Sequence, residues 1–135
     1  MTDAPTGTDR YASPLAIYAV LCLFVGFGGG IDGWFWPAEM PSYTWNDFVQ
    51  TIGIVVLTMM WITADGRQIG KPPASGLRIA TILFTPIGLL AHLLLSRRWT
   101  WALALWFGFV LGLVAAYLAG YLLVDAVLPD NDRPA

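Results

Sequence analysis

Charged residues are scarce in this chain of 135 residues, which has seven Lys and Arg, nine Asp and Glu, and 12% charged residues in all. A soluble domain carries about 25% charged residues, so the composition argues against a soluble protein. The formal net charge of −2 also leaves no broad basic surface of the kind that holds a phosphate backbone. We therefore expect no nucleic-acid partner.

The chain has a single cysteine, Cys22, and a single histidine, His92. One cysteine cannot form an internal disulfide, and its apolar neighbours predict a small buried side chain. One histidine cannot build a two-histidine metal site, and no group of Cys, His, Asp or Glu has the spacing of metal ligands or of a hydrolase centre. We therefore expect no metal and no catalytic residue, and we do not expect an enzyme.

Apolar residues are abundant, at 57% of the chain, and they gather in four uncharged stretches. A membrane-spanning helix needs about 20 mostly apolar residues. The sequence therefore predicts an all-α fold, a polytopic bundle of four transmembrane helices within a single membrane domain, residues 1–135. The helices are expected at about 13–31, 46–64, 78–96 and 99–125, between flexible tails at 1–12 and 129–135.

Local signals support these boundaries. Ser13 and Pro14 suit the start of the first helix, and Asn46 and Asp47 stand where the second needs an N-cap. Pro86 predicts a kink in the third helix, because it removes one backbone hydrogen bond. A cleaved signal peptide is the alternative for the first stretch, but it would have only Arg10 as its basic region and no Ala-x-Ala site.

The loops differ in charge. Residues 32–47 contain three acidic residues and no Lys or Arg, whereas the connection after the second helix brings Arg67, Lys71 and Arg78. Positive loops stay in the cytoplasm, so we expect both termini there, in a bacterial-type inner membrane, with Arg97 and Arg98 outside.

A rival topology treats residues 79–96 as a re-entrant hairpin broken at Pro86 and Gly88. It returns Arg97 and Arg98 to the inside and leaves only Arg133 outside. We prefer four spans, because irregular backbone is not tolerated in lipid and so small a chain could enclose a re-entrant loop only with a partner.

Aromatic rings surround the acidic loop. Amphipathic rings belong at the headgroup level, so we expect interfacial anchors at Trp34, Trp36, Trp45 and Trp99. The alternative use of such rings is a cage for an organic cation.

Small residues recur every fourth position in the last helix and again in the first, where they lower the surface into a groove. The predicted helix-docking residues are Gly108, Gly112, Ala116 and Gly120, with Gly26 and Gly30 in the first helix. The grooves could face each other within one chain, or one could receive a helix from another copy or another protein. The sequence leaves both possibilities open.

Ionisable side chains near the membrane are functional candidates because their burial is costly. Asp125 and Arg78 are predicted at the same inner level, where an ion pair would be structural. His92 could form an ion pair, change charge with pH, or ligate haem or a chlorophyll-type pigment, although such ligation commonly needs a second ligand. The outer carboxylates Asp32 and Glu39 could serve an enzyme, but two acids on a loop are a weak signal.

Residues 61–99 combine three features. These are a D-x-R turn at Asp65 and Arg67, a P-x-G-L-L segment at Pro86, Gly88, Leu89 and Leu90, and terminal arginines at Arg97 and Arg98. Together they resemble a hairpin of small, uncharacterised bacterial multi-pass membrane proteins, and they are distantly similar to the neoxanthin-deficiency type of plastid membrane protein, which is linked to carotenoid metabolism. The resemblance implies a membrane hairpin and carries over no catalytic residue; His92 stands where such hairpins often have an aromatic residue.

These observations predict a membrane protein that acts through helix contacts in the lipid bilayer. It would be an accessory, stabilising or assembly subunit of a larger membrane complex, or it would self-associate as a homo-oligomer. A small-solute transporter or channel is the second hypothesis. A membrane-embedded lipid or pigment enzyme is the third, and it requires His92, Asp32 and Glu39 to converge on one cavity.

Overall fold

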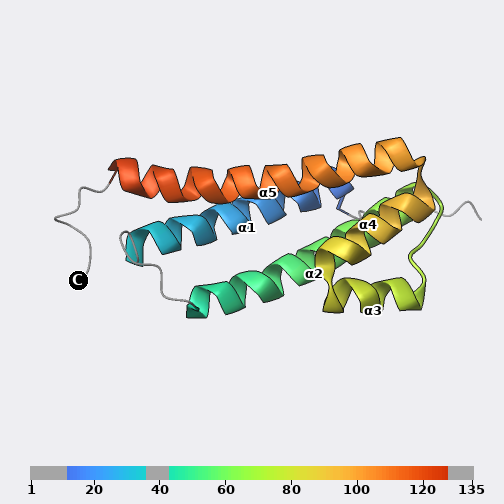
Figure 1. Cartoon of the computed structure of the whole chain (residues 1–135), viewed down its shortest axis with the longest axis horizontal. Coiled ribbons are helices and arrows are strands. Elements are labelled where there is room, and N and C mark those ends of the chain that lie inside the picture. The colour runs from blue at the N-terminus through green and yellow to red at the C-terminus, as the bar shows by residue number, and fades with distance from the viewer. Residues whose placement is uncertain (1–11, 36–42, 128–135) are drawn as a thin grey trace, which may run out of the picture.

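A computed structural model describes residues 12–35 and 43–127, which form five α-helices and no strand. The predicted all-α fold is confirmed for this part of the chain (Figure 1). The helices are α1 (Pro14–Phe35), α2 (Trp45–Gln68), α3 (Ser75–Leu83), α4 (Thr85–Ser96) and α5 (Trp99–Val127). The predicted tails lie outside the described residues, except for Ala12. Two candidate residues from the sequence analysis, Trp36 and Glu39, also lie outside them.

Among the described helices, three are long and apolar enough to cross a membrane: α1, α2 and α5. Their exposed surface is rich in large apolar side chains, among them Leu23, Phe27 and Leu111. Because so much exposed apolar surface is unfavourable in water, these three helices indicate a membrane protein.

The third predicted helix is not continuous. The sequence predicts one helix over residues 78–96, and instead α3 and α4 are separated at Phe84, whose backbone is not helical, at φ −143° and ψ 74°. Pro86 stands at the start of α4, where its missing N–H costs nothing, so it begins a helix here and does not kink one. The prediction of one continuous helix over residues 78–96 is therefore wrong, because two shorter helices occupy this segment.

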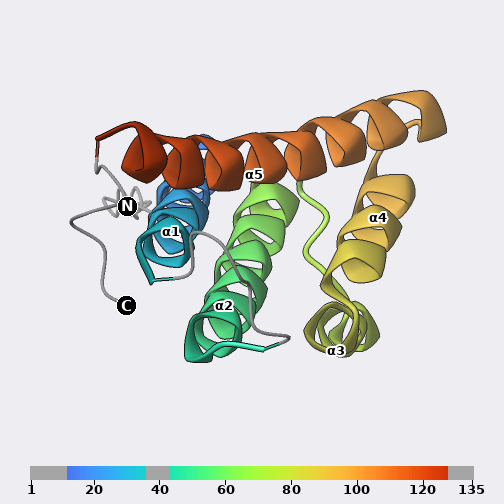
Figure 2. The same ribbon diagram turned by 60° about the vertical axis from the view of Figure 1, so that its left-hand side comes forward.

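Helices α1 and α5 lie side by side and run in the same direction (Figures 1 and 2). Contacts advance together along both: the Tyr18 hydroxyl donates to the Phe109 carbonyl, and Gly33 lies near Tyr121 at the other end. A first and a fourth crossing helix would run antiparallel, so the four-span bundle does not describe this pair.

The α3–α4 pair folds back on itself beside α2. Gly88 of α4 packs so closely on Thr81 of α3 that a Cβ there would overlap the Thr81 backbone. The indole Nε1 of Trp106 in α5 donates to the Pro86 carbonyl at 2.9 Å and ties the start of α4 to α5. As Figure 1 shows, α4 then ends beside the C-terminal end of α2.

Short-range chemistry defines the ends of α2. Thr44, not Asn46, is its N-cap, and it forms a capping box with Asp47. At the other end Gly70 adopts φ +70°, a conformation that favours glycine, and the amide of Lys71 donates to the Gly66 carbonyl at 2.7 Å.

A small apolar core joins α1, α2, α4 and α5. It consists of Leu21, Val25, Ile62, Leu89, Leu93, Ala102 and Phe109. These apolar side chains pack one helix against another. Two clusters of polar side chains, one at each end of α2, supply the specific hydrogen bonds between the helices.

Candidate functional site

The first polar cluster is built around Asp32, three residues before the end of α1. Its side chain is buried, with 6% exposed. Asn46 of α2 donates its amide to Asp32 Oδ1 at 2.8 Å and to the Gly28 carbonyl at 3.0 Å, while the Tyr117 hydroxyl of α5 donates to Asp32 Oδ2 at 2.8 Å. The carboxylate thus connects all three long helices.

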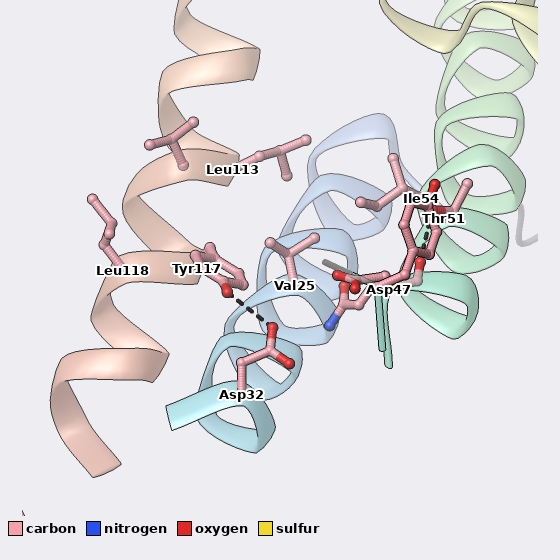
Figure 3. A pocket seen from close by; sticks show the side chains of 11 residues that line it. Val25, Asp32, Asp47, Thr51, Ile54, Leu113, Tyr117 and Leu118 are labelled. Carbon is pink, nitrogen blue, oxygen red and sulfur yellow. Dashed lines mark hydrogen bonds between the residues drawn. The ribbon is translucent and has the colours of Figure 1, made fainter. Parts of the chain in front are cut away.

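A groove opens beside this carboxylate between α1, α2 and α5, as Figure 3 shows. Its volume is about 560 Å³, within the range of small-molecule sites. One end is polar, and the rest is walled by aliphatic side chains. The polar lining residues are Asp32, Tyr43, Asp47, Gln50, Thr51 and Tyr117; the apolar ones are Val25, Ile54, Leu113, Val114 and Leu118.

The groove contains acid but no base. The sequence has no Lys, Arg or His between Tyr11 and Gly66, or between Trp99 and Asp132. Helices α1 and α5, and α2 as far as Gly66, therefore contain no cationic side chain that could balance Asp32 and Asp47. The side chains that donate to the Asp32 carboxylate are a neutral amide and a neutral phenol.

The second polar cluster lies at the opposite end of α2, around Asp65. Its side chain is 5% exposed. Its Oδ2 lies 3.1 Å from His92 Nε2, and its Oδ1 accepts from the Arg97 guanidinium. Nearby, the Lys71 ammonium donates to the Ser96 carbonyl at 3.3 Å. The sequence suggests only a local turn at Asp65, whereas its buried carboxylate holds the end of α4 against the end of α2.

This geometry changes the interpretation of His92. Its side chain is 3% exposed, and its Nε2 is already engaged by Asp65, so this nitrogen is not directed toward a pigment or haem. His92 and Asp32 bind opposite ends of α2, about 28 Å apart at about 1.5 Å per residue. They do not converge on one cavity, as the enzyme hypothesis requires.

The small residues of α1 and α5 face each other. A Cβ on Gly120 would overlap the Gly26 carbonyl, and one on Gly26 would lie 3.0 Å from the Ala116 carbonyl. Gly30 also faces this contact, since a Cβ on it would lie 3.5 Å from Val124 and 3.6 Å from Gly120, and Gly112 faces the Tyr18 hydroxyl. Of the two possibilities left open by the sequence, the structure realises packing within one chain.

Gly108 differs from the other small residues of α5. A side chain added there would meet nothing within 4 Å, so the close contact with α1 does not include it. The GxxxG pair of Gly108 and Gly112 is therefore used at only one of its two positions.

The remaining predicted residues are on the surface. Trp34, Trp45 and Trp99 are 37%, 58% and 68% exposed, which leaves their rings available to an interface. The predicted ion pair of Arg78 and Asp125 does not form, because α3 and α5 share no contact. The reason is the break at Phe84, which carries α3 away from α5.

Sequence reasoning missed three residues of the first cluster and of the groove beside it. The sequence suggests an N-cap role for Asn46, and it does not single out Tyr117 or Gln50. A polar side chain within an otherwise apolar helix was the available signal for Gln50, because burial of an amide requires partners. Tyr117 is 85 residues from Asp32, and no spacing rule joins them.

Comparison with known proteins gives no relative: no protein-family model, no curated protein and no solved structure matches this chain. The likeness of residues 61–99 to bacterial membrane hairpins and to the plastid protein type stays a prediction. Function therefore has to be argued from the helices and the two polar clusters.

Proposed function

We propose that the chain crosses the membrane three times, with α3 and α4 forming a re-entrant hairpin, and that it acts as an assembly subunit whose hairpin is covered by a second polypeptide. The first support is the direction of the helices. Parallel α1 and α5 suit a first and a third crossing, and the contact of Asp65 with Arg97 keeps both residues on one side.

Helix lengths agree with this topology. α3 has 9 residues and α4 has 12, so they extend about 14 and 18 Å, against about 30 Å of hydrocarbon. Each reaches about halfway. With α1 entering from the cytoplasm, Arg67, Lys71, Arg97 and Arg98 gather inside, as the positive-inside rule prefers, and the C-terminus lies outside.

The observation that carries the assembly role is the exposed break between α3 and α4. Residues at this apex present their side chains outward: Leu83, Phe84 and Ile87 are 66%, 64% and 63% exposed. The Phe84 carbonyl accepts from the Ile87 and Gly88 amides, but the chain leaves its regular helix here. Non-helical backbone at membrane depth is stable only when protein or a water-filled cavity surrounds it.

The side chains at the apex indicate what kind of partner would cover it. It would be a membrane-embedded helix with small or aliphatic residues, because the apex offers apolar side chains and no charge. Such a helix would exclude lipid from the backbone at Phe84. It would belong either to a second copy or to a different membrane subunit, which are the two forms of association expected from the sequence.

Site-specific crosslinking in native membranes tests the assembly role. In a Cys22→Ser background, Phe84→Cys would carry a short bifunctional thiol crosslinker or a thiol-attached photoprobe. Leu111→Cys is a matched control, because Leu111 and Phe84 are equally exposed at 64%. We expect protein adducts from position 84 and few from position 111, and the adduct mass distinguishes a second copy from another subunit. Equal yields at the two positions, or none at 84, would contradict the assembly role.

A further inference from the structure

The groove at Asp32 has an unbalanced charge at its polar end. Asp32 is buried at 6% exposure and is bound by neutral donors, and Asp47 lines the same groove. A buried carboxylate is costly in a low-dielectric environment unless a cation or several donors compensate it. Asp47 accepts from the Thr44 amide and hydroxyl, whereas the described residues supply the buried Asp32 carboxylate with two neutral side-chain donors and no cation.

A buried hydrogen-bond acceptor on Gln50 also calls for a donor in this groove. The Gln50 amide donates its Nε2 to the Phe24 carbonyl at 3.4 Å, and its Oε1 is buried without a hydrogen-bond partner. Gly28 makes room for this arrangement, because any Cβ there would overlap the Gln50 amide. A buried unsatisfied acceptor costs free energy that an incoming N–H donor would recover.

The remainder of the groove is apolar. Figure 3 shows Leu113 on the side away from Asp32, Val25 between the two, and Ile54 of α2 opposite. Between Val25 and Asp32 the helix rises about 10 Å, so one end of the groove lies near the helix terminus and the other lies deeper in the bundle. This division suits a ligand with one charged end and one aliphatic end.

We propose that this groove binds an amphiphile bearing a primary ammonium group. The ammonium would lie between Asp32 and Gln50 Oε1, and the aliphatic chain would lie along Val25 and Leu113. A primary ammonium supplies both the missing positive charge and the missing N–H donors, whereas a quaternary ammonium supplies charge alone. The chemistry is shared by an ethanolamine phospholipid and by a free long-chain amine.

Two pairs of probes separate charge from hydrogen bonding. The full chain would be reconstituted in nanodiscs containing either phosphatidylethanolamine or phosphatidylcholine, and lipid retention would be measured by native mass spectrometry. In neutral detergent, dodecylammonium and dodecyltrimethylammonium would be titrated separately. We expect the primary ammonium member to bind about tenfold more tightly in at least one pair. Preference in the lipid pair identifies a headgroup, and preference in the detergent pair alone identifies a free amine.

Variants connect the preference to the groove. Asp32→Asn should abolish it, and Asp125→Asn, which removes a carboxylate outside the groove, should retain it. Gln50→Met removes the orphan acceptor while keeping a similar volume, and it should reduce the preference several-fold even if Asp32→Asn does not fold. Equal binding within both probe pairs, or a full preference in folded Gln50→Met protein, would overturn the proposal. Because these measurements use the single chain, they remain informative if the assembly partner proves absent.

Discussion

Gly120 lies against the backbone carbonyl of Gly26, with no space between the two helices for a side chain. Lipid tails are as apolar as the helix surfaces, so helices gain little in the membrane by hiding apolar area from one another. Close backbone approach increases dispersion contacts and weak hydrogen bonds instead. The pairing of α1 and α5 therefore depends on glycine at these two positions.

Gly120→Val should separate α1 from α5 and lower the free energy of unfolding by about 1–3 kcal/mol, the usual cost of overpacking. Gly108→Val is the matched control on the same helix, because no atom lies within 4 Å of an added Cβ there. Thermal unfolding in mild detergent measures both variants. A melting temperature that falls equally in the two would show that the close contact is not the cause.

Arg97→Gln should destabilise the protein, because it removes the charged partner of the buried Asp65 carboxylate. We expect a loss of about 1–2 kcal/mol, since the Arg97 side chain is 30% exposed and partly screened by solvent. The adjacent exposed Arg98 provides the control Arg98→Gln, with the same change of charge. Chemical unfolding curves compare the two variants, and an equal loss would point to net charge and not to the buried pair.

Trp106→Phe should loosen the start of α4 by removing the indole donor to the Pro86 carbonyl. The cost is expected to be about 1 kcal/mol, the net contribution of a hydrogen bond. Hydrogen exchange of amides in residues 85–90 should accelerate in this variant. Trp101→Phe, at a residue 68% exposed on the same helix, should leave that exchange unchanged; acceleration in both variants would indicate a general effect of losing an indole.

Cysteine labelling from the two sides of the membrane tests the proposed topology. In a Cys22→Ser background, Gly70→Cys and Arg98→Cys should be labelled by an impermeant thiol reagent from the same side. Tyr43→Cys should be labelled from the opposite side, because α2 separates it from residue 70. Labelling of positions 70 and 98 from opposite sides would restore the four-span arrangement.

Composition and hydropathy were enough to predict the helical fold and its three long helices. Charged residues are the informative signal here, since Asp47 and Asp65 delimit the apolar part of α2 within a few residues of its ends. The helices exceed the predicted limits because capping and polar flanking residues continue the regular backbone. Thr44 extends α2 at its start in this way.

The break at Phe84 could not be located from periodicity. Residues 79–96 are uncharged throughout, so they satisfy the rule for one crossing as well as for two half-helices. What separates the alternatives is tertiary: the close approach of Gly88 to Thr81 and the bond from Trp106 to Pro86. Pro86 marked the region, but proline suits both a kink and a helix start.

The partners of the buried polar residues could not be predicted from the sequence either. His92 was recognisable as a costly group near a membrane, whereas Asp32 was expected in an outer loop and Asp65 in a local turn; the partners of all three lie on other helices. Helix spacing relates residues three or four apart and says nothing about Tyr117, which reaches Asp32 from the last helix. The function of a buried charge can be suspected from its depth, whereas its chemistry depends on which neighbours the fold supplies.

The pairing of the first helix with the last has a consequence for biosynthesis. When the ribosome has completed α1 and α2, the surface around Gly26 still lacks its counterpart, because Gly120 lies more than 90 residues later in the chain. The nascent protein therefore has to keep that surface available, or shielded by an insertion factor, until α5 has been made. A premature stop before Gly120 would remove this contact and leave α1 packed on α2 alone.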